Sequence, residues 1–259
     1  MKNRTKYALW LCVAALTFVC LAITYSMGAK RSHESVCSGL KVIIADSTVN
    51  GFVSVKDITT LINREYGKVN GKPIDSVDLN KIERIAGIRS AVRTSEAYIT
   101  SDGKLNVRIT QRRPVVRFQN GNTGFYADED GFLFPLQKTF SAEVPIVEGS
   151  LPVSVSDAAY GRMTNPRQKE WIMQIIGMIL SFDNDKRWRG CITQIHVNGH
   201  QELEVATRRG KEVFLFGQPT DIQDKMDKME TYFRIILPSR NKPYKTVDLR
   251  FKGKILGKD

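Results

Sequence analysis

The sequence predicts an α+β protein with an N-terminal transmembrane helix, a small mixed unit and a larger strand-rich unit with two helices. First, Tyr7–Met27 runs for 21 residues without a charge. Second, apolar residues at helical spacing fill two short segments that lie between strand-like segments in the next part of the chain. Third, beyond Pro114 most segments alternate apolar and polar residues, a period typical of strands.

The composition fits a folded protein with a basic surface. Of the 259 residues, 42% are apolar and 25% are charged, which is typical of globular domains. The formal net charge of +12 permits attraction to several kinds of anionic partner. No block of lysine and arginine with interleaved aromatic residues resembles a nucleic-acid reader, so we expect a solvated basic surface and no nucleic-acid partner.

Residues 7–27 have the length and composition of a membrane-spanning helix. As a helix they extend about 31 Å, which matches the hydrocarbon core of a bilayer. A cleaved signal peptide has an apolar region of only about 7–15 residues, so an anchor is favoured over a signal peptide. Lys2, Arg4 and Lys6 precede the span with no acidic residue among them. We therefore expect the N-terminus in the cytoplasm and the rest of the chain outside.

The first unit has the order strand, helix, helix, strand, strand. Leu40–Ser47 is the first strand, and Ser54 with Asp57 has the spacing of a capping box at the start of a helix. Asp102-Gly103 favours a tight hairpin between the last two strands. The positions expected to be buried on the helices and the last strand are Val55, Ile58, Leu61, Ile62, Leu79, Ile82, Ile85, Leu105, Val107 and Ile109.

The second unit is expected to be mostly strands. Asp130-Gly131 indicates a hairpin, and Asn165-Pro166 has the residues of a helix N-cap and first turn. A three-stranded meander follows, in which one extra residue in the first turn places Ile195 opposite Leu203. Thr220 is expected to cap the last helix.

The chain ends in a segment with a period of two. A half-buried strand is therefore expected, and either earlier parts of the chain pair with both its edges or one edge is left open for something else. The apolar set is Val247, Leu249, Phe251 and Ile255, and the charged set between them is Asp248, Arg250, Lys252 and Lys254.

Motifs that carry catalysis are not found in the sequence. His196 and His200 have the spacing of a helical metal site, but Asn198-Gly199 interrupts them, so they are expected to flank a turn. Serine and cysteine lack the surroundings of a nucleophile, and no phosphate-binding loop is present. We expect no enzyme activity, metal, cofactor or small-molecule substrate. Cys37 and Cys191 are either a disulfide or two free thiols.

Four strings in a fixed order carry a resemblance to a known family. They are "LNVRITQRRPVVRF" (105–118), "FYADEDGFLFP" (125–135), "VPIVEG" (144–149) and "YKTVDLRFKGK" (244–254). Together with the order of elements they resemble FtsQ/DivIB, a family of bacterial cell-division proteins, and the first unit is similar to a POTRA domain. The organisation expected is a cytoplasmic tail (1–6), a transmembrane helix (7–27), a linker (28–38), a POTRA-like domain (39–113) and a β domain ending in an edge strand (114–259).

The resemblance implies a non-catalytic scaffold in the bacterial inner membrane at the division septum, linked to septal peptidoglycan synthesis. Its partners would be small bitopic coiled-coil proteins of the FtsB/DivIC and FtsL kinds. They would be recruited by β-strand addition to the last strand. The matching string contains Asp248, Leu249, Arg250, Phe251 and Gly253, with Phe251 where the family typically has tyrosine.

Lys252 and Lys254 are added to the expected partner-binding residues because of their charge, since a cationic face suits acidic partner residues. Alternatively, these lysines only discourage aggregation between sheet edges.

Two alternative functions are considered. A POTRA-containing factor for envelope protein transport or outer-membrane assembly would contain repeated POTRA units, which the sequence lacks. An exported hydrolase would need an acid or base with a perturbed pKa in a pocket.

Overall fold

The computed structural model describes Trp10, Val13 and residues 15–23, 36–47, 51–138, 140–153 and 160–259. The chain divides into two compact units. Unit 1 comprises Met1–Asp46 and Val53–Thr110, and unit 2 comprises Ser47–Phe52 and Gln111–Asp259.

The predicted span at residues 7–27 lies partly outside the described residues. Those described within it are helical, and their apolar side chains are exposed, with Trp10 at 76% and Phe18 at 74%. Among the residues that the structure describes, no helix combines the length and apolar character needed to cross a membrane.

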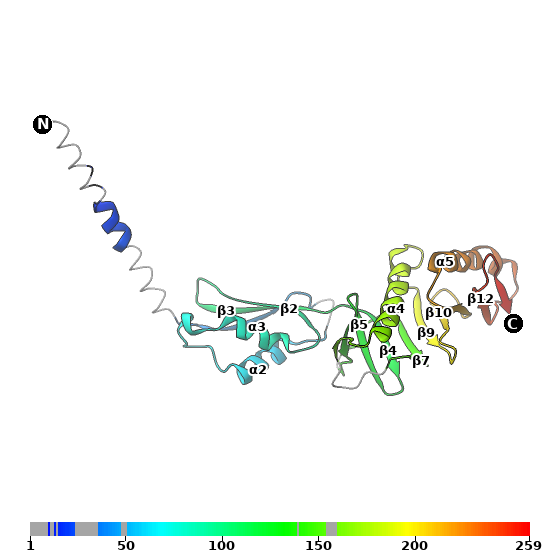
Figure 1. Cartoon of the computed structure of the whole chain (residues 1–259), viewed down its shortest axis with the longest axis horizontal. Helices are drawn as coiled ribbons and strands as arrows, with labels where there is room; N and C mark the ends of the chain where they lie inside the picture. Colours follow the sequence, from blue (N-terminus) through cyan, green and yellow to red (C-terminus); the bar gives the residue numbers. More distant parts are fainter. Residues whose placement is uncertain are drawn as a thin grey trace. The chain divides into compact units, whose positions relative to one another are not determined.

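Unit 1 has the predicted order of strand, helix, helix, strand, strand (Figure 1). Its sheet has the strand order β1-β3-β2, with β1 and β3 parallel. The helices α2 and α3 pack against each other and against the sheet. The elements are β1 (Gly39–Ile44), α2 (Val55–Glu65), the 3-10 turn η1 (Ile74–Ser76), α3 (Leu79–Gly87), β2 (Val92–Ile99) and β3 (Lys104–Gln111).

The predicted cap of α2 is confirmed. The Ser54 hydroxyl accepts a hydrogen bond from the Asp57 amide at 3.1 Å and donates to the Asp57 carboxylate at 2.7 Å. This satisfies one of the free N–H groups at the helix start and fixes where the helix begins. Ile58 and Ile62 then point inward and are fully buried.

Unit 2 is built on a single sheet whose ten strands have the order β13-β12-β11-β10-β9-β7-β4-β5-β6-β8. The pairs β4–β7, β7–β9 and β11–β12 are parallel. The strands are β4 (Pro114–Asn120), β5 (Thr123–Asp128), β6 (Phe132–Pro135), β7 (Ile146–Gly149), β8 (Gly161–Arg162), β9 (Ile192–Val197), β10 (Leu203–Thr207), β11 (Val213–Gly217), β12 (Thr246–Asp248) and β13 (Leu256–Lys258).

Two helices cover this sheet and close one core. They are α4 (Pro166–Asn184) and α5 (Ile222–Thr231), and they contact each other (Figure 1). The predicted N-cap of α4 is confirmed, because Asn165 Oδ1 accepts from the amides of the first turn. A π turn η2 (Tyr232–Ile236) and a 3-10 turn η3 (Leu237–Ser239) continue α5. Inward residues of both helices share one hydrophobic cluster with the strands.

A second aromatic cluster lies on the opposite face of the β5–β6 hairpin. Phe125 and Ala127 point into the main core, so Tyr126 between them points the other way. The ring of Phe52 meets those of Tyr126 and Phe134 edge-on, each with centroids 5.3 Å apart. Phe52, which precedes α2 in the chain, therefore contributes to the packing of unit 2.

The predicted register between β9 and β10 is wrong. Ile195 pairs with Val205, and Leu203 pairs with Val197, because the loop is longer than expected. The side chain of Asn198 accepts from the amides of His200 and Glu202, which stabilises the longer loop and keeps apolar residues opposite each other.

The start of the last helix also differs. The N-cap of α5 is Asp221, in the left-handed region with φ of 50°, and no side chain caps the helix.

The predicted terminal strand is also wrong in its extent. Val247 and Leu249 are fully buried, as the alternation predicts, but the strand stops at Asp248. The chain then turns back, and β13 pairs antiparallel with β12. Phe251 consequently does not continue the buried face and is 49% exposed.

Phe52→Ala should destabilise unit 2 by about 3–5 kcal/mol, because it removes a buried ring and leaves a cavity. The measurement is urea unfolding of the full chain, followed by the fluorescence of Trp171 and Trp188, which lie in unit 2. The prediction that Val55 is buried is wrong, because this first residue of α2 is 49% exposed, and Val55→Ala is therefore the control. Equal stability of the Phe52 variant and the control would contradict this packing role.

Candidate functional site

The C-terminal strand pair forms one end of the ten-stranded sheet. β12 is bonded on one side to β11, with Val247 opposite Phe214, and on the other side to β13, with Val247 opposite Gly257. β13 is the last strand in the sheet order, and its three residues are exposed. The outer edge of β13 is therefore the edge at this end of the sheet, and β12 is an interior strand.

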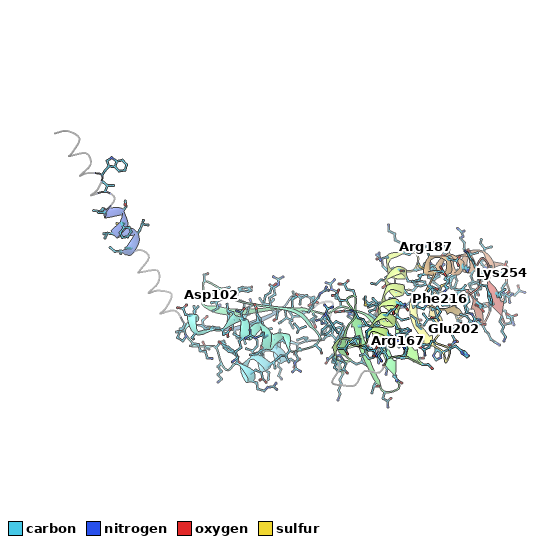
Figure 2. The ribbon with its side chains drawn as sticks, viewed as in Figure 1. Asp102, Arg167, Arg187, Glu202, Phe216 and Lys254 are labelled. Carbon is cyan, nitrogen blue, oxygen red and sulfur yellow. The ribbon has the colours of Figure 1, made fainter. Side chains whose placement is uncertain are left out.

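A short turn joins the two strands. The Lys254 amide donates to the Phe251 carbonyl at 3.2 Å, and Gly253 between them has φ of 67°, which glycine adopts without a steric penalty. Before this turn, Leu249 is held against β11, since its amide donates to the Leu215 carbonyl at 3.1 Å. Lys252 and Lys254 are exposed in the turn, and Lys254 lies near the C-terminus (Figure 2).

Arg250 ties the strand end to the neighbouring β9–β10 loop. Its guanidinium makes a two-pronged contact with Asp248, Nε to Oδ1 at 3.0 Å and Nη2 to Oδ2 at 2.6 Å. The remaining Nη1 donates to Glu202 Oε2 at 2.9 Å. The aliphatic stem of Arg250 packs closely on Gly217, where a larger residue would collide with it. This network accounts for the Asp-Leu-Arg string in structural terms.

The same contacts shift the pKa values of Asp248 and Arg250. The guanidinium of Arg250 hydrogen-bonds the Asp248 carboxylate and lowers the pKa of that carboxyl below its ordinary value. Reciprocally, the hydrogen bond to Asp248 raises the pKa of Arg250. The ion pair is therefore retained well below neutral pH.

β13 is fastened to unit 2 at its far end. The ring of Tyr244 lies directly on Gly257, where any side chain would overlap it. The guanidinium carbon of Arg240 lies over the same ring, 3.5 Å from its centroid, and Arg240 pairs with Asp259 at 2.8 Å. These contacts hold a three-residue strand that would otherwise be too short to stay in register.

The structure brings the predicted partner-binding residues together, although not on one strand. Asp248 ends β12, Leu249 is fully buried, and Arg250 is engaged in the ion pairs described above. The remaining predicted residues lie in the turn and are exposed: Phe251, Lys252, Gly253 and Lys254.

Several residues of this region were missed by sequence reasoning. Leu256 and Lys258 form the outer strand, with Leu256 48% exposed. Glu202 and Lys228 reach the turn from distant segments, so no local pattern identifies them. The glycine at position 257, two residues before the last residue, was the available signal for a close approach.

The two histidines do not form a helical site. His196 lies on β9, and His200 lies in the following loop, as predicted. Cys37 and Cys191 are free thiols, which resolves the alternative left open by the sequence.

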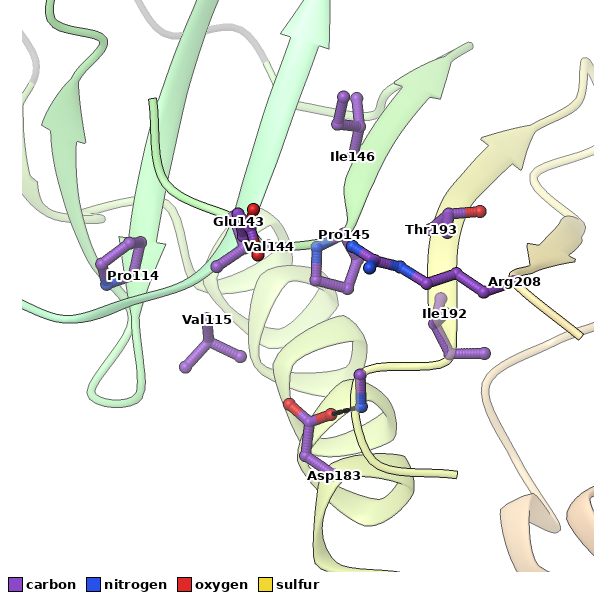
Figure 3. Close-up of a pocket in the computed structure, with 11 residues that line it drawn as sticks. Pro114, Val115, Glu143, Val144, Pro145, Ile146, Asp183, Ile192, Thr193 and Arg208 are labelled. Atoms are coloured by element: carbon purple, nitrogen blue, oxygen red, sulfur yellow. Dashed lines mark hydrogen bonds between the residues drawn. The ribbon is translucent and has the colours of Figure 1, made fainter. Parts of the chain in front are cut away.

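A pocket of about 450 Å³ lies elsewhere in unit 2, where the parallel strands β4, β7 and β9 begin. Pro145 and Ile192 line it with the charged residues Glu143, Asp183 and Arg208, and Arg208 extends toward Pro145 (Figure 3). Asp183 Oδ1 accepts from the Gly190 amide at 3.0 Å. The lining residues include neither histidine nor cysteine, so they do not pair a nucleophile with an imidazole base.

Unit 1 has its own partly covered sheet edge. The Ala97 amide on β2 donates to Glu83 Oε1 on α3 at 2.7 Å, and Ser95 Oγ donates to the Glu83 carbonyl at 2.7 Å. The first of these bonds occupies a main-chain N–H group of β2 that an added strand would need. The edge of β2 is therefore a weaker candidate for strand addition than the edge of β13.

Comparison with protein families identifies both units. The family described as "FtsQ/DivIB, C-terminal related" matches residues 113–257, which is more than half of the chain. The chain belongs to the FtsQ/DivIB family. A POTRA-like domain matches residues 35–110, most of which lie in unit 1. A comparison with curated proteins found no match.

These matches confirm the resemblance found in the sequence, and the α+β class with a POTRA-like domain and a strand-rich sheet. For an FtsQ/DivIB protein the corresponding role is that of a cell-division scaffold that interacts with other division proteins. Members of this family are generally non-catalytic. Apart from Lys258 and Asp259, the candidate site lies within the region matched to FtsQ/DivIB.

Asp248→Asn should reduce the dependence of stability on acidic pH. Because the folded-state pKa of Asp248 is lowered, its ion pair stabilises the protein above the ordinary aspartate pKa of about 3.9. This contribution is lost as the pH falls through the lower folded-state pKa. The variant should therefore be less stable at pH 7 and lose less stability between about pH 5 and pH 2 than the original protein.

The measurement is thermal unfolding across this pH range. Glu170→Gln, at an exposed position of α4, is the control for removing a surface carboxylate. If the Asp248 variant and the original protein lose the same stability between about pH 5 and pH 2, the ion pair contributes nothing to the pH dependence of stability.

Proposed function

We propose that this protein is a non-catalytic, membrane-anchored scaffold of the bacterial division machinery that recruits small bitopic partners by β-strand addition. The partners are proteins of the FtsB/DivIC and FtsL kinds, through which the scaffold is linked to septal peptidoglycan synthesis. The observation that supports this most strongly is the outer edge of β13, the last strand in the sheet order. Family membership supports the division role.

The edge of β13 can supply affinity through its main chain. A strand that joins this edge would bond to backbone N–H and C=O groups, as strand-adding peptides do. Phe251 and Leu256 are about half exposed and offer apolar contacts beside these groups. A strand of three residues gives few hydrogen bonds, so the side chains of the turn must contribute to the interface.

The charge of this surface selects for an acidic partner segment. Lys252, Lys254 and Lys258 are exposed around the edge. Arg250 is already paired with Asp248 and Glu202, so it stabilises the strand end and the lysines remain for the partner. Opposite charges across an interface raise the association rate and exclude basic competitors.

The membrane anchor is part of this proposal. The uncharged residues 7–27 would form a single span, with residues 1–6 in the cytoplasm and residues 28–259 on the other side of the inner membrane. Reporter fusions after residue 6 and after residue 259 test this topology. Both reporters on the same side of the membrane would contradict it.

Phe251→Glu and Leu256→Glu should each weaken recruitment of the FtsB/DivIC-like protein of the same cell by tenfold or more, about 1.4 kcal/mol. Each change removes an exposed apolar contact and places a negative charge where an acidic partner is expected. The measurement is the amount of this partner that co-purifies with tagged full-length protein.

Ile88→Glu is the matched control, because Ile88 is 67% exposed in unit 1. It should leave recruitment unchanged. Normal recruitment by folded Phe251 and Leu256 variants, or equal loss with the Ile88 variant, would refute the assignment of this edge.

A further inference from the structure

We propose that Lys228 of α5 is the positioning residue that sets the turn between β12 and β13, and thereby the outer edge to which a partner binds. This inference rests on the proposed function for the role of the edge. The contacts of Lys228 with the turn stand independently of any partner.

All three donors of the Lys228 ammonium are used. Nζ donates to the Phe251 carbonyl at 2.8 Å and the Leu249 carbonyl at 3.2 Å, and it pairs with Asp224 Oδ2 at 2.6 Å. A lysine ammonium has three N–H groups and no acceptor, so this environment satisfies it. The side chain is 9% exposed, which makes an unsatisfied charge costly and the observed arrangement specific.

The two carbonyls are the ones that decide where the strand ends. The Phe251 carbonyl is also the acceptor for the Lys254 amide, which closes the turn. Lys228 therefore fixes the first residue of the turn and, through it, the direction in which the chain returns as β13. It also explains why the alternation of the terminal segment breaks after Leu249.

The topology of the sheet places α5 next to the turn that follows β12. β11 and β12 are parallel, and α5 lies between them in the chain, so its first turns come to the carboxyl ends of both strands. Lys225 donates to the Gln218 carbonyl just after β11 at 2.7 Å, and Lys228 serves the carbonyls after β12. Each of the two lysines thus donates to carbonyl groups at the end of one strand, and of the two it is Lys228 that reaches the C-terminal turn.

The test compares Lys228→Met with Lys225→Met in the full chain. Both changes keep the aliphatic stem and remove a largely buried ammonium, so they are matched for general destabilisation. Amide hydrogen exchange of Lys254, and of those amides in Leu256–Lys258 that face β12, should accelerate about tenfold in the Lys228 variant. In the Lys225 variant these amides should exchange within about twofold of the original rate. Equal acceleration in both variants, or none in the Lys228 variant, would overturn the proposal.

A measurement on the unaltered protein covers the case in which the Lys228 variant does not fold. The ¹⁵Nζ resonance of Lys228 should show slowly exchanging protons and a scalar coupling to the carbonyl carbon of Phe251. A freely exchanging ammonium without this coupling would overturn the proposal.

Partner affinity separates this inference from the proposed function. Recruitment of the FtsB/DivIC-like protein should fall about tenfold in Lys228→Met and stay unchanged in Lys225→Met. Accelerated exchange with unchanged recruitment would overturn the positioning role. Failure of the original protein to recruit this partner at all would instead refute the proposed function, while the exchange and coupling measurements would still test the turn.

Discussion

The pairing of β12 on both sides is the constraint on which the rest of this site depends. β11 occupies one edge of β12 and β13 the other, so the edge at this end of the sheet belongs to β13. Main-chain groups at a sheet edge must find water or another strand. A three-residue strand offers few such groups, and its position must be held by side chains.

Three sets of side-chain contacts hold β13 in position, each at a different point of the C-terminal segment. Arg250 binds Asp248 and Glu202 and fixes the end of β12 to the β9–β10 loop. Lys228 binds the carbonyls that open the turn, and Tyr244 packs on Gly257 in β13 itself. Two of the three use buried or half-buried charges, which stabilise a geometry only while every partner is in place. The surface that results is small, basic and fixed in position, which suits recognition of an acidic extended segment.

Local patterns predicted most elements, and two of their failures arise where a polar side chain bonds to the main chain. The capping of α2 and α4, the hairpin at Asp130-Gly131 and the buried faces of the helices depend on neighbouring residues, so the sequence predicts them. The terminal strand was predicted too long because its end is decided by Lys228, 21 residues away in the chain. The β9–β10 register was shifted because the Asn198 side chain stabilises a longer loop than a residue count suggests. Polar contacts from side chains to the main chain, whether near or distant in the chain, are not contained in the periodicity of a sequence.

The family assignment and the geometry support the same role by different arguments. Membership of the FtsQ/DivIB family indicates a scaffold in cell division, and the sheet edge is a physical means by which a scaffold can bind a partner. Binding a partner in this way needs no catalysis, but it does need a sheet edge that is held in a fixed position.

The most direct measurement is amide hydrogen exchange, residue by residue, in the full chain with and without its FtsB/DivIC-like partner. We predict new protection at those amides of Leu256–Lys258 that face away from β12, while the amides of Thr246–Asp248, which lies between β11 and β13, keep their rates. Loss of protection in β13 on binding, or new protection only at other strands, would contradict strand addition at this edge.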